Sequence, residues 1–330
     1  MDNKRTPAFL LCAALCVTAA LLSLCLGAAR LTLGELWSAV VSGPTGTAGY
    51  IFWYSRLPRT CACLLSGAAL AASGCILQSL LGNKLASPGI IGVNAGAGLA
   101  VTLCCALGAL GGWITALASF GGAMAAVATV MLLARKTGAS RTTVILAGVA
   151  MNSILTAFRD ALTSLVPDTA ALSGEFRVGG FSAVVTARLI PAGILIVLAL
   201  AAAFTLCNDL DILSLGEETA TSLGMSVGRT RTLFLLLAAL LAGASVSFAG
   251  LLGFVGLLVP HIARRLVGSE TRRLLPFSAL AGAAFVTVCD LIARLLFAPH
   301  ELYVGILLSV IGGPFFLFLL LREKGGRRRA

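Results

Sequence analysis

The chain has 330 residues, of which 58% are hydrophobic and only 11% are charged, and its mean hydropathy is +1.01. A soluble globular domain carries about 25% charged residues, so this composition excludes a soluble protein and favours one that crosses a membrane several times. The net charge of +11 does not indicate nucleic acid as a partner, because the basic residues lie in short clusters between apolar runs. Such clusters are typical topology signals of membrane proteins.

The first apolar run spans residues 9–29 and follows Lys4 and Arg5. It is longer than the apolar core of a secretory signal peptide, and about 20 residues suffice to cross a bilayer. We therefore expect it to be retained as the first span. The mixed segment 31–54, which contains Gly43-Pro44, is expected to be a loop with one interfacial helix.

Nine further apolar runs each predict a membrane-spanning helix: 58–80, 90–108, 112–134, 142–165, 188–207, 230–250, 252–267, 274–297 and 302–321. The fold class expected is therefore all-α, a polytopic membrane protein with about ten transmembrane helices in a single domain, 1–330. The eighth span is short and carries Pro260-His261 near its end. From the count of spans alone, spans two to five and seven to ten could be two inverted repeats.

The basic residues predict the orientation of these spans. Ten spans place both termini on one side of the membrane, and with cytoplasmic termini the inner segments hold 17 of the 24 Lys and Arg residues. These are Lys4, Arg5, Lys84, Arg135, Lys136, Arg141, Arg229, Arg231, Arg264, Arg265, Arg272, Arg273, Arg322, Lys324, Arg327, Arg328 and Arg329. The excess of positive charge favours cytoplasmic termini.

Between spans six and seven the chain turns polar over residues 208–231, NDLDILSLGEETATSLGMSVGRTR. Ser214 followed three residues later by Glu217 is a capping-box pattern for a helix start, and Gly224 is well placed to end the helix. Apolar residues recur at roughly helical spacing at Leu215, Ala220, Leu223 and Val227. The segment therefore predicts a short, rigid helix on the cytoplasmic side, and an ordinary surface loop is the alternative.

No motif for catalysis or for a bound cofactor is present. Nothing matches GxxxxGK[ST], GxGxxG, HExxH or GxSxG, and no CxxC pair occurs among the ten cysteines. We therefore expect no catalytic residue, no metal site and no cofactor held by this chain. Active transport would need a separate energy-supplying subunit or an ion gradient. Charged residues within the spans, Arg159-Asp160 and Asp290, leave an ion-gradient-driven secondary transporter open as the alternative.

Further motifs follow one another in order along residues 56–321: Arg56-Leu57-Pro58-Arg59, 67–74 (GAALAASG), 83–92 (NKLASPGIIG), Leu215-Gly216-Glu217, 253–264 (GFVGLLVPHIAR), 290–294 (DLIAR) and 312–315 (GGPF). Together they resemble the permeases of ABC importers for ferric siderophores, haem and cobalamin (FecCD-type). The resemblance implies a ten-helix permease in a bacterial plasma membrane that acts as a homodimer, or pairs with a paralogous permease. It also implies two cytoplasmic ATPase subunits that use ATP, and an extracytoplasmic substrate-binding protein.

The same resemblance implies three sets of functional residues. The first set would couple the permease to the ATPase subunits: Leu215, Gly216, Glu217, Ala220, Leu223 and Gly224. The second would receive acidic residues of the binding protein: Arg56, Arg59 and Arg294. The third, at the inner start of the fifth span, would lie near an inner gate: Thr142 and Thr143.

Overall fold

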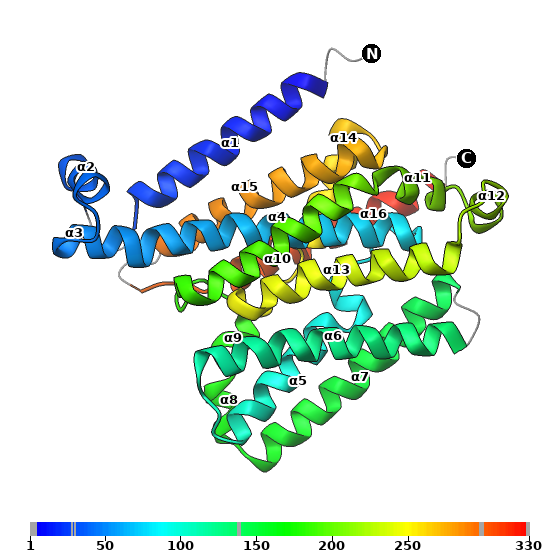
Figure 1. Ribbon diagram of the computed structural model, residues 1–330, viewed down its shortest axis with the longest axis horizontal. Helices are drawn as coiled ribbons and strands as arrows, with labels where there is room; N and C mark the ends of the chain where they lie inside the picture. Colours follow the sequence, from blue (N-terminus) through cyan, green and yellow to red (C-terminus); the bar gives the residue numbers. More distant parts are fainter. Residues whose placement is uncertain (1–4, 28, 30, 137–139, 297–299, 328–330) are drawn as a thin grey trace.

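The computed structural model describes residues 5–27, 29, 31–136, 140–296 and 300–327, and every regular element within them is a helix (Figure 1). Seven of the described helices are long and apolar enough to cross a membrane: Thr6–Cys25, Gly46–Leu81, Gly112–Lys136, Arg141–Leu165, Thr186–Thr205, Val227–Ala249 and Thr271–Leu295. Two shorter apolar helices cover Val93–Ala106 and Val304–Phe318. The prediction of an all-α, polytopic membrane protein is confirmed.

Each of the ten predicted spans overlaps one main helix. In chain order these are α1 (Arg5–Cys25), α4 (Leu57–Leu81), α5 (Val93–Ala106), α6 (Gly112–Lys136), α7 (Arg141–Leu165), α10 (Thr186–Thr205), α13 (Val227–Ala249), α14 (Val255–Val267), α15 (Thr271–Leu295) and α16 (Val304–Arg327). The third predicted span opens with a short 3-10 helix, η3 (Pro88–Ile91), and α1 ends at Cys25, before the predicted end of the first span. Ala28 and Phe297, at the ends of two predicted spans, and Lys4, Arg328 and Arg329 lie outside the described residues.

The segment 31–54, predicted to be mainly a loop, is mostly helical. It forms α2 (Leu33–Ser42), α3 (Gly46–Tyr50) and a π-helix, η2 (Ile51–Arg56), which runs directly into α4. A capping box starts α2, because the Thr32 N–H donates to Glu35 Oε2 (2.7 Å) and the Glu35 N–H donates to Thr32 Oγ1 (3.3 Å). The Thr-x-x-Glu pattern was the signal in the sequence that could have predicted this helix.

Helix α4 lies at the centre of the bundle and packs against α13, α14 and α15 (Figure 1). Small residues allow this close packing: a Cβ atom at Gly67 would collide with the Gly282 backbone of α15, and one at Gly74 with the Gly256 backbone of α14. Such contacts let helices approach closely in lipid, where no hydrophobic force drives them together. The glycines therefore fix α4 against two neighbouring helices.

The two ends of the bundle carry different features. In Figure 1 the start of α1, the end of α16 and two short helices, α11 (Cys207–Ser214) and α12 (Glu217–Ser222), lie toward the right. Helices α2 and α3 and the start of α4 lie toward the left. The polar segment between spans six and seven is therefore at the same end of the molecule as both described termini.

Candidate functional site

The polar segment 208–231, here called the coupling segment, contains the predicted short helix. Helix α12 starts at Glu217, after Gly216 with φ +121°, and Gly224 follows its end with φ +81°. Both angles lie in the region that favours glycine. The predicted capping box is wrong: Ser214 belongs to the preceding helix, α11, and its hydroxyl donates to the Asp211 carbonyl (2.7 Å). Gly216 is the N-cap residue of α12, and no side chain caps this helix.

Two leucines project from the coupling segment. Leu215 is 67% exposed and Leu223 is 63% exposed, whereas Ala220 between them is fully buried. Apart from the adjoining residues of the chain, no described atom lies within 4 Å of where a Cβ atom at Gly216 or Gly224 would be. An exposed apolar surface with polar residues around it is typical of a site that contacts another protein or a membrane.

The coupling segment is fastened to three long helices. The Asp211 carboxylate accepts hydrogen bonds from the Thr271 backbone N–H (3.0 Å) and hydroxyl (2.5 Å) at the first residue of α15. A carboxylate at that position also interacts favourably with the helix dipole. The Arg141 guanidinium, at the start of α7, donates to the Leu213 carbonyl (2.8 Å). A displacement of α11 would therefore reach α15 and α7 directly.

The third attachment joins α12 itself to α13. Glu217 forms an ion pair with Arg231, whose side chain is almost fully buried although that of Glu217 is half exposed. Because a charge removed from water needs a partner, this pair holds the start of α12 against α13. The coupling segment therefore combines an exposed apolar surface with firm polar connections to the bundle.

Thr142 and Thr143, predicted to lie near an inner gate, are in the first turn of α7. Ser140 caps this helix by accepting a hydrogen bond from the Thr143 N–H (3.1 Å), and the two hydroxyls lie 2.8 Å apart. Thr142 is exposed. Both threonines are next to Arg141, the residue that holds the coupling segment, and a gating role stays a prediction.

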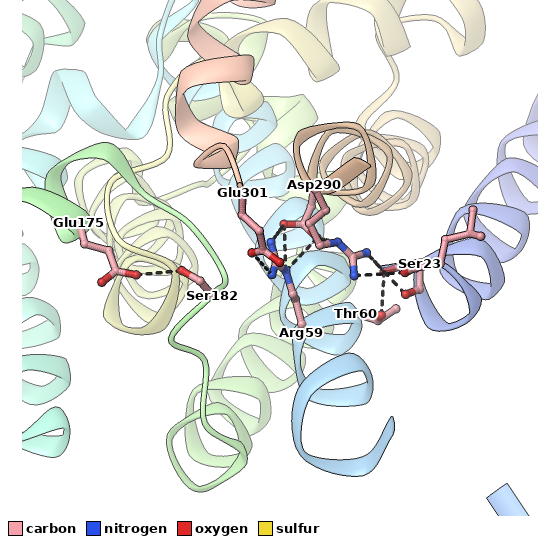
Figure 2. A network of polar contacts seen from close by, with 9 residues as sticks. Ser23, Arg59, Thr60, Glu175, Ser182, Asp290 and Glu301 are labelled. Carbon is pink, nitrogen blue, oxygen red and sulfur yellow. Dashed lines mark hydrogen bonds and ion pairs between the residues drawn. The ribbon is translucent and has the colours of Figure 1, made fainter. Parts of the chain in front are cut away.

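At the opposite end of the bundle, four charged residues form what we call the arginine network: Arg59, Asp290, Arg294 and Glu301 (Figure 2). Arg59 of α4 bonds to Asp290 of α15 (3.0 Å) and to Glu301 before α16 (2.7 Å). Arg294 lies 3.0 Å from Asp290 and donates to Ser23 Oγ of α1 (2.8 Å). The two positive and two negative charges balance, which reduces the cost of burying them.

Arg56 lies beside this network and holds the end of α1. Its guanidinium donates to the carbonyls of Leu24 (2.8 Å), Cys25 (2.6 Å) and Ala29 (2.6 Å). The carbonyls of Leu24 and Cys25 belong to the last turn of α1, where no later helical N–H group can bind them. Arg56 is only 4% exposed and Arg294 only 3% exposed. The family resemblance implied that these arginines receive the binding protein, but the side chains of Arg56 and Arg294 are buried, and a docking role stays a prediction.

The model of the FecCD transport family matches residues 15–322. The chain belongs to the FecCD transport family. It is 38% identical over 314 residues to the iron(3+)-hydroxamate import system permease FhuB of Bacillus subtilis, covering 93% of this chain and 81% of FhuB. It is 35% identical over 320 residues to the hemin transport system permease HmuU of Yersinia pestis, covering 95% of both.

A solved structure agrees with these relatives. It is described as an inward-facing conformation of a metal-chelate type ABC transporter and superimposes with a TM-score of 0.84 at 27% identity, covering 95% of this chain and 98% of that one. The chain is therefore a membrane-spanning permease subunit of an ABC importer, as the sequence motifs predicted. The alternative of an ion-gradient-driven secondary transporter is not favoured.

The permease also contains functional candidates that the sequence did not identify. Asp211 and Arg231 hold the coupling segment, and Ser23 completes the contacts of Arg294. Asp211 and Thr271 are 60 residues apart, and Ser23 and Arg294 are 271 residues apart. No local pattern in a single sequence reports such contacts. A polar residue next to a span end was the only available signal.

Proposed function

We propose that this permease imports an iron chelate or haem across a bacterial inner membrane. FhuB is named for an iron(3+)-hydroxamate and HmuU for hemin, which supports this ligand class. Cobalamin, the third class that the motifs imply, is not in these names. In this proposal the termini and the coupling segment face the cytoplasm, as the positive-inside distribution favours.

ATP is hydrolysed by two partner subunits and not by this chain. The observation that carries this proposal is the coupling segment, with its exposed Leu215 and Leu223 and its bonds to three helices. A partner ATPase that binds these leucines moves α12, and the bonds of Asp211, Arg141 and Glu217 pass the movement to the spans. The spans would then alternate between a state open to one side of the membrane and a state open to the other, and ATP binding would change the populations of these two states.

A second permease copy completes the pathway, and an extracytoplasmic binding protein delivers the substrate. Arg59 is the best placed of the three proposed docking arginines, because its partner Glu301 is 34% exposed at the edge of the network. Arg59 would reach the binding protein by exchanging Glu301 for a carboxylate of that protein. Such exchange would favour the correct partner through charge complementarity.

Co-purification followed by ligand screening tests the proposed substrate class. The full chain is expressed with its ATPase and binding-protein subunits, and the co-purified binding protein is heated with ferric hydroxamates, ferric catecholates, haem or corrinoids. We expect an iron chelate or haem to raise its melting temperature, because a ligand that binds only the folded state stabilises it. Stabilisation by corrinoids alone would contradict the proposed substrate.

A further inference from the structure

A cavity of about 370 Å³ opens between the ends of α6, α7 and α13, at the same end of the molecule as the coupling segment. Its apolar wall includes Met131, Val144 and Leu235. Three guanidinium-bearing residues, Arg135, Arg229 and Arg231, line the same cavity. Cavities of about 300–1,000 Å³ are typical of small-molecule sites.

Two of the three arginines that line the cavity, Arg135 and Arg229, form no ion pair with a described carboxylate. Among the residues that the structure describes, Glu217 pairs with Arg231, and no carboxylate forms an ion pair with Arg135 or Arg229. Arg135 donates to Thr232 Oγ1 (3.1 Å), which fixes its position without neutralising its charge. The positive charges of Arg135 and Arg229 are therefore not balanced by an ion pair with a described carboxylate, which favours an anion in the cavity.

We propose that this cavity binds the phosphate headgroup of an anionic phospholipid. The guanidinium groups match a phosphate, with which arginine forms paired hydrogen bonds. The apolar wall would accept the glycerol and the first part of the acyl chains, which a free phosphate does not have. Basic pockets between helices on the cytoplasmic side are known positions for anionic headgroups.

The site also suggests a regulatory role for the lipid, because Arg231 faces both the cavity and Glu217 of α12. A phosphate at Arg231 would compete with Glu217 and so change how firmly α12 is held against α13. This inference rests on the proposed orientation, in which the cavity lies at the cytoplasmic leaflet. Anionic lipid would then set how strongly ATP hydrolysis in the partner subunits is coupled to movement of the spans.

Lipid binding to the full permease in detergent is measured by native mass spectrometry, with phosphatidylglycerol and phosphatidylcholine of matched acyl chains. We expect Arg135→Gln combined with Arg229→Gln to weaken phosphatidylglycerol binding by about 30-fold, since each basic residue contributes about 1 kcal/mol. Arg135→Lys with Arg229→Lys, which keeps both charges but not the paired hydrogen bonds, should lose less affinity than the double Gln variant. The matched control is Arg265→Gln with Arg272→Gln, which removes two exposed charges outside the cavity and should leave the affinity nearly unchanged.

Three results would overturn the proposal: equal affinity for the two lipids, an equal loss in the control, or binding of inorganic phosphate or glycerol phosphate as tight as that of phosphatidylglycerol. The last result would assign the cavity to a soluble anion. The binding measurement needs neither substrate nor ATPase subunits. Its failure is therefore distinct from failure of the proposed transport function, which the co-purification and uptake experiments report.

Discussion

Arg59 and Asp290 form a buried ion pair, 3.0 Å long, that joins the central helix α4 to α15. Asp290 is 1% exposed and is the one carboxylate that both Arg59 and Arg294 contact among the described residues. Removing one partner of such a pair leaves charge buried without compensation. This relationship explains why the arginines predicted to be docking residues are also structural residues.

Asp290→Asn is therefore expected to destabilise the permease by about 3–5 kcal/mol, because it leaves the buried guanidinium groups uncompensated. The stability is measured by thermal unfolding of the purified full chain in detergent. Glu301→Gln removes a more exposed carboxylate from the same network and should cost only about 0–1 kcal/mol. Equal destabilisation by the two variants would contradict the account of the network.

The exchange proposed for Glu301 predicts a gain in binding-protein affinity. Glu301→Gln leaves Arg59 less occupied, so the binding protein should dock more tightly, by about 1 kcal/mol or roughly fivefold. Surface plasmon resonance with the permease in nanodiscs measures this affinity. The matched control is Glu175→Gln, since Glu175 is exposed and accepts from Ser182 Oγ (2.8 Å), apart from the arginine network (Figure 2). Weaker docking of the Glu301 variant would count against the exchange.

The backbone at Gly216 predicts an uncoupling variant. Proline cannot adopt the φ of +121° found there, so Gly216→Pro should displace or unfold the start of α12 at a local cost of about 1–3 kcal/mol. We expect normal insertion and dimerisation, with ATP hydrolysis no longer linked to uptake. Uptake and ATPase rates are measured together in proteoliposomes. Gly121→Ala, at an open helical position in α6, is the control, and full uptake by Gly216→Pro would contradict the coupling role of α12.

Asp211 should contribute both to stability and to coupling. Asp211→Ala removes the carboxylate that binds the start of α15, and hydrogen bonds to charged groups each contribute about 1.5–3 kcal/mol. We expect a lower melting temperature and reduced uptake per ATP hydrolysed. Asp209→Ala makes the same charge change in α11, where no hydrogen bond of the Asp209 side chain is found among the described residues, and should change both quantities less. A larger effect of Asp209→Ala would disprove the proposed connection.

The reactivity of the Cys207 thiol reports on the position of the Asp211 carboxylate, which binds the start of α15. Burial, followed by the nearby Asp211 carboxylate, raises the pKa of the Cys207 thiol to about 11. Because the thiolate is the reactive form, peptide-resolved alkylation of Cys207 should be slow at neutral pH and should accelerate toward pH 11. Asp211→Ala should lower this pKa and speed the reaction. Fast alkylation of Cys207 at neutral pH in the unaltered chain would contradict the buried position.

The sequence predicted the helices better than it predicted the polar contacts. Runs of about 20 apolar residues have few alternatives to a spanning helix, so the ten helices could be located from composition and length. Capping depends on local backbone geometry: Thr32 caps α2 in a segment predicted to be a loop with one interfacial helix, whereas Ser214, predicted to begin α12, is the last residue of α11. The inward direction of the Arg56 side chain could not be predicted, because it depends on carbonyl groups at and just after the end of α1, 27 to 32 residues away in the sequence.

The central claim is that this chain forms a transport pathway driven by ATP hydrolysis in partner subunits. The most direct measurement is uptake of a radiolabelled ferric chelate or haem into proteoliposomes that contain the full permease, with and without its ATPase subunits, in the presence of the binding protein. Our account predicts uptake only with the ATPase subunits and ATP, and none in response to a proton or sodium gradient. Gradient-driven uptake by the permease alone would contradict it.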